Sequence, residues 1–536
     1  MAIQIDAFDV QLGAALLLQF TAATGTPIRV LADAGAPLKD RRRYPFSKVA
    51  EQLDEAFAAF GSGDRRIDLM IGTHYDADHL TGLTPIVEDL GFEIGQAWLP
   101  PVVNDVSAAP ADGPVRSSEF FALQLAGPQG KAVLRSYLDQ KARVCVALAR
   151  LERGADDFSG LLRSGLKGLQ LDESVGAKIR LSPGFFERHR RDAWETLGGP
   201  PDHDHGRELE SDPGPAEDEL YPYWLYRGEH GGRLRKAWAT SDGSLRALAE
   251  VVEARREELP GQVVPDARAL AAVRASEASK AINAKALAGL VAALKRREVP
   301  IRCEFINDGA PSRFVWQASS RAFVAGQTLS SDGPVLKLLG PSRQLIDKHR
   351  NLLPIGDYMA KVAFTRIRVQ GVTESNQLSY VLAVEAESQR LLVSGDTGFN
   401  DFRRLNSRDP YYPSLLQALK PLHVIQVAHH GGHNGHFYNV LLSAGFAAQT
   451  EPSFLLLSHE TDDRTRPSIE FGQFIAEVRK DGDDMTLLFT ARPSAEKVLD
   501  YRTLIAPASP PGGADRGDVR LRFDRGWSVV RHPVGF

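Results

Sequence analysis

The stretch Ile67-Asp-Leu-Met-Ile-Gly-Thr-His74-Tyr-Asp76-Ala-Asp78-His79 contains the pattern that decides the fold. Residues 67–72 form a short apolar run that is typical of a buried strand. Directly after it, four potential metal ligands fall within six positions. Because alternating residues of an extended segment point to one side, His74 and Asp76 are placed to hold one divalent ion, and Asp78 and His79 a second. Imidazole and carboxylate groups together suit zinc, manganese or iron.

Two later segments repeat this order of apolar strand and polar ligand. The run 391–394 ends in Gly395-Asp396, a turn that places the Asp396 carboxylate at the carboxyl end of a strand, where it could bridge two metal ions. The run 424–428 is followed by four of the chain's 14 histidines within eight residues, namely His429, His430, His433 and His436. Such a density of imidazoles after a strand favours a binding site over a surface loop.

The pattern around these segments predicts an α/β fold in three parts. Extended runs at 3–20 and 27–33 precede helical spacing at 46–60. Later strand patterns at 300–306, 335–339, 364–369, 378–384, 390–394, 424–427 and 454–457 alternate with helical ones at 411–420, 436–445 and 467–480. Residues 106–282 show long helical periodicity and a polar tract instead. We therefore divide the chain into a first half (1–105), a mainly helical insertion (106–282), and a second half with a C-terminal extension (283–536).

The composition is that of a globular protein without a general attraction for nucleic acid or anionic lipid. Lys and Arg total 64 against 68 Asp and Glu, so nucleic-acid contact would need a local basic patch. Two cysteines without a CxxC pair exclude a cysteine-based zinc site and favour a reducing, cytoplasmic location. The early apolar run 13–20 is too short to span a bilayer, which predicts no membrane association. The chain also lacks a phosphate-cradling Walker loop.

The order of these motifs resembles the metallo-β-lactamase fold superfamily. It is most similar to the branch that contains the hydrolase domain of the competence protein of DNA uptake, with His-x-Asp-x-Asp-His, an Asn-containing strand, Leu-Leu-x-Gly-Asp and His-His-Gly. Residues 374–382 correspond to the Asn-containing strand, and 8–13 and 31–35 are similar to the family's first hairpin. The resemblance covers about 1–105 and 283–500. It implies a four-layer αββα sandwich with the insertion added.

The resemblance also implies a dinuclear site held by His74, Asp76, Asp78, His79, Asp396 and one of His429 or His430. Two divalent ions, zinc or manganese, would lower the pKa of a bridging hydroxide and clamp the scissile phosphoryl or carbonyl oxygen. We expect Asp78 to bind metal and orient the hydroxide, Asp396 to set the metal spacing, and His433 to donate to an oxyanion or leaving group. The residues predicted to contact substrate are Asn376, His436 and His459.

The chain departs from the family pattern at two positions. Asn376 stands where a histidine commonly completes one metal's set of ligands, and Arg466 stands where relatives often have the histidine of a His-Pro pair. His459 is a substitute for that histidine or a neighbour of the ligands. These departures imply weak binding of one metal, or manganese rather than zinc. For His433 and His436 the alternative is a surface or capping role, and for Asn376 a structural one.

We expect a metal-dependent hydrolase, a phosphodiesterase or nuclease acting on DNA or RNA. Basic residues at 131–153 and 188–191 are a potential phosphate-binding face, and a solvated helix face is the alternative. One alternative function is hydrolysis of a small phosphodiester or ester. Another is binding of a protein partner through the insertion, beside a degenerate metal site. The clustered carboxylates argue against an idle site, because without metal they repel one another. His203-Asp204-His205 lies in a polar tract without a strand to position it.

Overall fold

The computed structural model describes residues 1–11, 13–35, 49–89, 91–101, 120–135, 137–138, 283–307, 309–326, 328, 330–350, 374–404, 409–458, 460–479, 485–507 and 518–532. Most of the predicted insertion, the predicted strand 364–369, the basic run 188–191, the 203–205 segment and His459 lie outside these residues. No helix in the described ranges is both long and apolar enough to cross a membrane.

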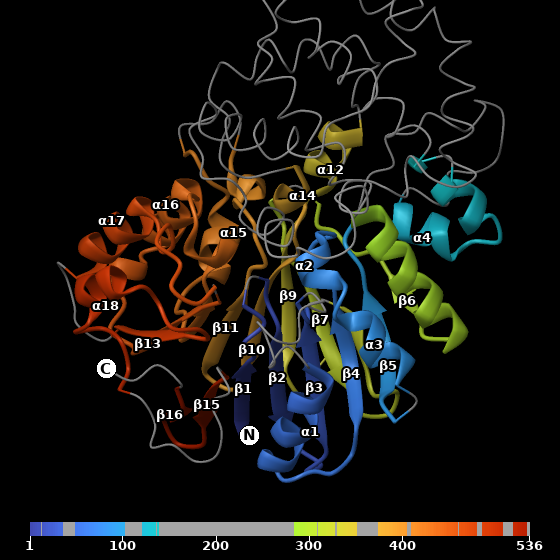
Figure 1. Ribbon diagram of the computed structural model, residues 1–536, viewed down its shortest axis with the longest axis horizontal. Coiled ribbons are helices and arrows are strands. Elements are labelled where there is room, and N and C mark those ends of the chain that lie inside the picture. The colour runs from blue at the N-terminus through green and yellow to red at the C-terminus, as the bar shows by residue number, and fades with distance from the viewer. Residues whose placement is uncertain are drawn as a thin grey trace, which may run out of the picture.

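The fold is mixed α/β and contains two eight-stranded sheets, each with parallel and antiparallel neighbours (Figure 1). The first sheet has the order β16-β15-β1-β2-β3-β4-β5-β6, and β3 to β6 are parallel. Its strands are β1 (Ile3–Ala7), β2 (Leu16–Thr21), β3 (Pro27–Ala32), β4 (Arg66–Ile71), β5 (Glu93–Trp98), β6 (Ile301–Arg302), β15 (Val519–Phe523) and β16 (Trp527–Arg531). The chain beyond residue 283 thus contributes three strands to the sheet that the first hundred residues begin.

The second sheet has the order β14-β13-β12-β11-β10-β9-β7-β8, and β11 to β14 are parallel. Its strands are β7 (Ser312–Gln317), β8 (Ala322–Ala325), β9 (Val335–Gly340), β10 (Val381–Ala386), β11 (Gln389–Val393), β12 (Val424–Gln426), β13 (Ser453–Leu457) and β14 (Met485–Phe489). Every strand of this sheet comes from the second half of the chain.

Helices connect the strands and cover the sheets. The α-helices are α1 (Val49–Ala59), α2 (Ala77–Leu80), α3 (Leu83–Glu88), α4 (Phe121–Ala126), α12 (Arg343–Arg350), α14 (Glu374–Gln377), α15 (Pro413–Ala418), α16 (Gly435–Ser443), α17 (Ile469–Val478) and α18 (Ala495–Tyr501). Residues 130–135 and 283–296 are also helical. Short 3₁₀ helices are η3 (Asn400–Phe402), η4 (Ala428–Gly431) and η5 (Phe446–Ala448).

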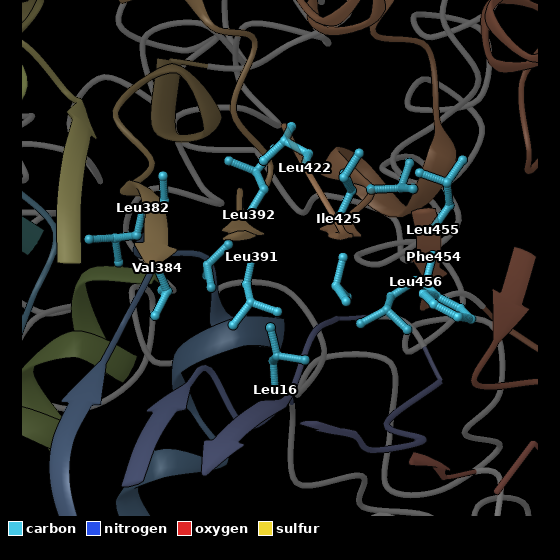
Figure 2. Close-up of a cluster of buried hydrophobic side chains, with 14 of the residues drawn as sticks. Leu16, Leu382, Val384, Leu391, Leu392, Leu422, Ile425, Phe454, Leu455 and Leu456 are labelled. Carbon is cyan, nitrogen blue, oxygen red and sulfur yellow. The ribbon is translucent and has the colours of Figure 1, made fainter. Parts of the chain in front are cut away.

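The main core lies between the sheets, because alternate residues of each strand face inward. On β2, Leu16 and Leu18 belong to the same buried cluster as residues of β10 to β13, whereas Leu17 faces the other side of the sheet (Figure 2). On that other side, Leu17 packs in a second cluster with α1, α3 and the helix 283–296. Helices α15, α16 and α17 pack with the second sheet. This packing holds the carboxyl ends of β4, β11 and β12 at one edge.

Several strand predictions need correction. The extended run 3–20 is two strands, β1 and β2, because residues 8–11 and 13–15 between them belong to neither strand, and Gly13 has a φ of +102°. The run 300–306 forms only the two-residue strand β6. Asn376 lies in α14 rather than in a strand, because the polar residues 374–377 form a helical turn and β10 begins at the apolar Val381. Strands β5, β7, β8, β14, β15 and β16 were not predicted.

Candidate metal centre

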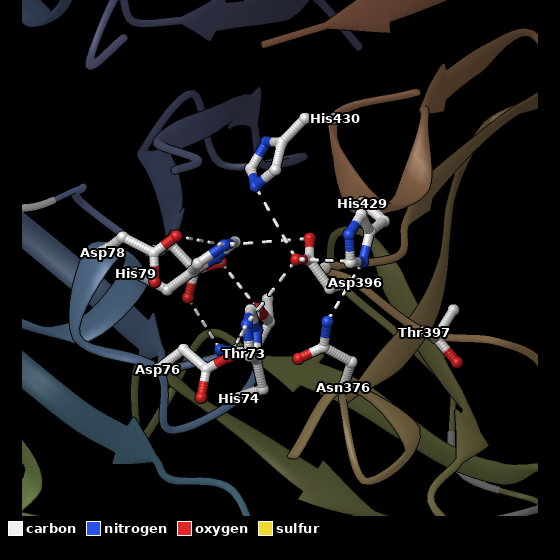
Figure 3. A network of polar contacts seen from close by, with 12 residues as sticks. Thr73, His74, Asp76, Asp78, His79, Asn376, Asp396, Thr397, His429 and His430 are labelled. Carbon is white, nitrogen blue, oxygen red and sulfur yellow. Dashed lines mark hydrogen bonds and ion pairs between the residues drawn. The ribbon is translucent and has the colours of Figure 1, made fainter. Parts of the chain in front are cut away.

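The predicted motifs meet where strands of the two sheets end (Figure 3). Strand β4 leads into the Thr73–His79 segment, β11 into Gly395-Asp396, and β12 into His429 and His430. The Tyr380 amide donates to the Thr73 carbonyl oxygen across the sheets at 2.7 Å. The carboxyl ends of parallel strands are the usual location of binding sites in α/β folds.

The first motif supplies four buried side chains, His74, Asp76, Asp78 and His79, which are at most 8% exposed. The chain bends at Thr73 and His74, and Asp76 is the extended residue directly before helix α2. His74 Nε2 lies 3.6 Å from Asp76 Oδ2, and His79 Nε2 lies 3.8 Å from Asp78 Oδ2. The motif therefore forms the two His-Asp pairs that its spacing predicts.

Asp396 lies between these two pairs. Its Oδ1 is 3.7 Å from His79 Nε2, and its Oδ2 is 3.9 Å from His74 Nε2. The turn before it needs a glycine, because Gly395 has a φ of +50° and a Cβ there would lie 2.6 Å from Thr73 Oγ1. The close approach of the two sheets at Gly395 thus brings the carboxylate to both histidines.

The backbone at His429 and His430 is held in an unusual conformation. Both residues are left-handed, with φ values of 55° and 54°, and Gly431 continues with 75°. Such conformations cost on the order of 1–3 kcal/mol each for a non-glycine residue and persist where surrounding structure imposes them. The consequence is that the two adjacent imidazoles both approach Asp396, with His429 Nδ1 at 3.7 Å and His430 Nε2 at 3.6 Å from Oδ2.

The hydrogen bonds of these two histidines favour His430 as the ligand. The Asn376 amide donates to His429 Nδ1 at 3.0 Å, the same nitrogen that faces Asp396. His430 instead donates from Nδ1 to the Ser458 carbonyl oxygen at 3.0 Å, which directs the Nε2 lone pair towards the site. Ligand atoms of Asp78, His79 and His430 lie within 4.8 Å of one another.

Asp33, directly after β3, is a site residue that the motifs did not indicate. It accepts hydrogen bonds from His79 Nδ1 at 2.8 Å and from the Thr73 hydroxyl at 2.6 Å. That hydroxyl oxygen lies 3.1 Å from His74 Nδ1. Metal-binding histidines commonly have one ring nitrogen fixed in this way by a carboxylate or other acceptor. Because the Asp33 carboxylate accepts the hydrogen bond from His79 Nδ1, we infer that Asp33 orients the imidazole of His79 and is not itself a metal ligand. An apolar strand ending in aspartate, as at Asp396, is the signal that could have identified it.

The charges of the site stabilise a cation. Burial lowers the pKa of His79, but the carboxylates of Asp33, Asp78 and Asp396 outweigh this effect and raise it well above 6.5. Burial raises the pKa of Asp396, but four surrounding imidazoles hold it well below its ordinary value. Carboxylates that favour a proton on a buried histidine also favour a divalent cation bound to that histidine in place of the proton.

The residues present could hold a metal ion. Among the described residues, the buried Nε2 atoms of His74 and His79 have no hydrogen-bond partner. Leaving a buried polar atom unsatisfied costs roughly 1–3 kcal/mol, and coordination would remove that cost. The donors are imidazole nitrogens and carboxylate oxygens, a set that suits zinc, manganese or iron.

The predicted residues His433 and His436 hydrogen-bond residues outside the ligand cluster. His433 Nδ1 is 2.8 Å from Glu470 Oε2. Burial raises the pKa of Glu470, but the hydrogen bonds to its carboxylate and the charge of His433 together outweigh burial and lower it. His436 Nε2 accepts from Arg403 Nε at 2.8 Å, and its Nδ1 is 2.5 Å from the Gly398 carbonyl oxygen. Burial lowers the pKa of His436 to about 4. Both ring nitrogens of His436 are therefore engaged within the protein.

Arg466 is buried beside the histidine loop. Its Nε lies 3.4 Å from the position that a Cβ on Gly432 would occupy, and His429 Cδ2 lies 2.6 Å from that position. Its guanidinium is 3.5 Å from Asp463 Oδ2. Arg466 thus places a cation, already paired with a carboxylate, near the site.

Comparison with protein-family models and with curated protein sequences gives no match for this chain.

Proposed function

We propose that this chain is a metal-dependent phosphodiesterase with a dinuclear centre, built on the four-layer αββα sandwich of the metallo-β-lactamase superfamily. The position of Asp396 between the two His-Asp pairs is the observation that carries the proposal: Oδ1 lies near His79, and Oδ2 lies near both His74 and His430. A carboxylate with donors on both sides could bridge two adjacent divalent ions of the kind that two-metal hydrolases use. The shared core between the sheets and the helices packed outside them support the sandwich.

We assign the ligands to two groups that share Asp396. His74 and Asp76 form one group, and Asp78, His79 and His430 form the other. The first group has fewer protein ligands, since Asn376 hydrogen-bonds His429 instead of contributing an imidazole. Weaker binding of the metal in the first group, or use of manganese rather than zinc, follows from this difference.

The chain's own residues would position the reacting groups. Two divalent ions, when bound, would supply Lewis acidity and a nucleophilic water at neutral pH. Asp78, whose carboxylate lies beside His79, would bind metal and orient that water. His433, hydrogen-bonded to Glu470, would donate a proton to a leaving group. The function proposed for these residues is hydrolysis of a phosphodiester in DNA or RNA.

Hydrolysis of labelled single- and double-stranded DNA and RNA tests the proposal, with manganese, zinc or magnesium added to the metal-free chain. We expect metal-dependent cleavage that is lost in Asp78→Ala. Asp524→Asn is the matched control, because Asp524 is exposed in the β15–β16 turn. Bis(p-nitrophenyl) phosphate serves as a small substrate in parallel.

The outcomes separate the alternatives. Cleavage of the small diester without cleavage of nucleic acid would favour a small-molecule phosphodiesterase. Absence of both activities in a chain that binds metal would contradict a phosphodiesterase, and equal activity in Asp78→Ala would contradict the assigned site.

A further inference from the structure

Asn283 links a distant part of the chain to the candidate metal centre. It is 2% exposed and is the first described residue after the gap that begins at 139. Its Nδ2 donates to Asp76 Oδ1 at 2.6 Å, and its Oδ1 accepts from the Ala77 amide at 3.1 Å. One side-chain amide therefore holds both the carboxylate of a predicted ligand and the backbone that follows it.

The helix that carries Asn283 is fixed in the core. Leu287, Leu290, Val291 and Leu294 recur at helical spacing and are at most 1% exposed. They pack in the same cluster as Leu80 of α2 and Ile86 of α3. Because both ends of the contact are anchored, the Asn283 amide is pre-organised rather than recruited by the ligand.

This contact makes the two oxygens of Asp76 unequal. Oδ1 accepts a short hydrogen bond from Asn283, and Oδ2 is the oxygen that lies 3.6 Å from His74 Nε2. A hydrogen bond of this kind fixes the rotation of the carboxylate. Small divalent ions such as Mg²⁺ require near-octahedral geometry and bind a carboxylate through one oxygen. Ca²⁺ has a flexible coordination geometry and binds a carboxylate through one or both oxygens.

We propose that Asn283 is a positioning residue that restricts Asp76 to ligation through Oδ2 and thereby makes the His74–Asp76 half of the centre select against large cations such as Ca²⁺. This inference rests on the metal-binding part of the proposed function and not on the identity of the substrate. It assigns a role to the junction between the predicted insertion and the second half of the chain.

Competition between Mn²⁺ and Ca²⁺ for the metal-free full-length chain tests the inference, with binding followed by calorimetry and without any substrate. In Asn283→Ala we expect the ratio of Mn²⁺ affinity to Ca²⁺ affinity to fall by about tenfold or more, the lower end of the effect of removing a partner of a metal ligand. Arg296→Ala on the same helix is the matched control. It removes an exposed ion pair to Glu88 and should leave the ratio unchanged.

The outcomes distinguish this inference from the proposed function. Metal binding by the unmodified chain with an unchanged ratio in Asn283→Ala overturns the role of Asn283 alone. Absence of binding to the unmodified chain overturns both. If Asn283→Ala does not fold, Asn283→Ser provides the same test, because its shorter hydroxyl cannot reach both partners. An equal loss of affinity for the two ions, with no change in ratio, would also contradict selection through Asp76.

Discussion

Two buried carboxyl groups, Asp9 and Asp518, make the stability of the fold depend on pH. Burial raises the pKa of Asp9 from 3.8 to about 7 and that of Asp518 from 3.8 to about 6. The Asp9 amide donates to Asp518 Oδ1 at 3.1 Å, so the two residues lie side by side. The Gln52 amide donates to the same oxygen at 2.7 Å. An asparagine at 518 would keep this acceptor oxygen while removing the charge.

The magnitude follows from proton linkage. Since the folded pKa values are raised, the folded chain binds more protons than the unfolded chain between about pH 4 and 7, and stability falls as the pH rises through that window. For Asp518, the interval from pH 5 to its folded pKa is about one unit, which is worth about 1.4 kcal/mol. We therefore expect the stability of Asp518→Asn relative to the unmodified chain to increase by about 1.4 kcal/mol between pH 5 and pH 8.

Urea unfolding of the metal-free chain at both pH values measures this difference, with the fluorescence of the buried Trp98 and Trp316 as the signal. Asp524→Asn serves as the control, because this exposed carboxylate lies beside β15 and should show no pH-dependent gain. Contributions from the metal ligands cancel in the comparison, since they are common to all variants. A constant difference between Asp518→Asn and the unmodified chain across the pH range would refute the reasoning.

Three further predictions concern the site and its backbone. In calorimetry, His430→Ala should abolish metal binding by the group of Asp78, His79 and His430, whereas His429→Ala should retain it. Loss of binding in His429→Ala alone would instead make His429 the ligand. Asp33→Asn should weaken metal affinity by about 10–100-fold through loss of histidine orientation, and unchanged affinity would exclude that role. Gly395→Ala should destabilise the chain by more than Gly25→Ala in urea unfolding. Both glycines have positive φ, but only at 395 would a Cβ meet a neighbour, at 2.6 Å. An equal loss of unfolding free energy in the two variants would mean that the contact between the new Cβ and Thr73 does not destabilise the fold.

The local pattern was sufficient to predict the segments that carry the candidate metal ligands. His74, Asp76, Asp78 and His79 follow an apolar run whose strand character the structure confirms as β4, and Asp396 follows β11 in the same way. The mixed α/β class follows from the alternation of such runs with helical patterns. Each of these inferences depends only on residues close together in the chain.

The contacts that orient the candidate ligands could not be predicted from the local sequence pattern. Asn283 is 207 residues from Asp76, and Asp33 is 46 residues from His79, so both contacts depend on tertiary structure. The choice between His429 and His430 depends on left-handed backbone angles, of which the sequence shows only the neighbouring Gly431. The helical turn at Asn376 likewise replaced a predicted strand, because strand pairing in the second sheet begins only at Val381.

Titration of the metal-free chain with Mn²⁺ by calorimetry, alongside Asp396→Asn, tests the central claim most directly. The amide of Asp396→Asn keeps the shape of the side chain and removes the shared negative charge between His74 and His79. We predict two equivalents of Mn²⁺ for the unmodified chain and one or none for Asp396→Asn. Failure of the unmodified chain to bind Mn²⁺ or Zn²⁺, or the same stoichiometry and affinity in Asp396→Asn, would contradict a dinuclear centre at this site.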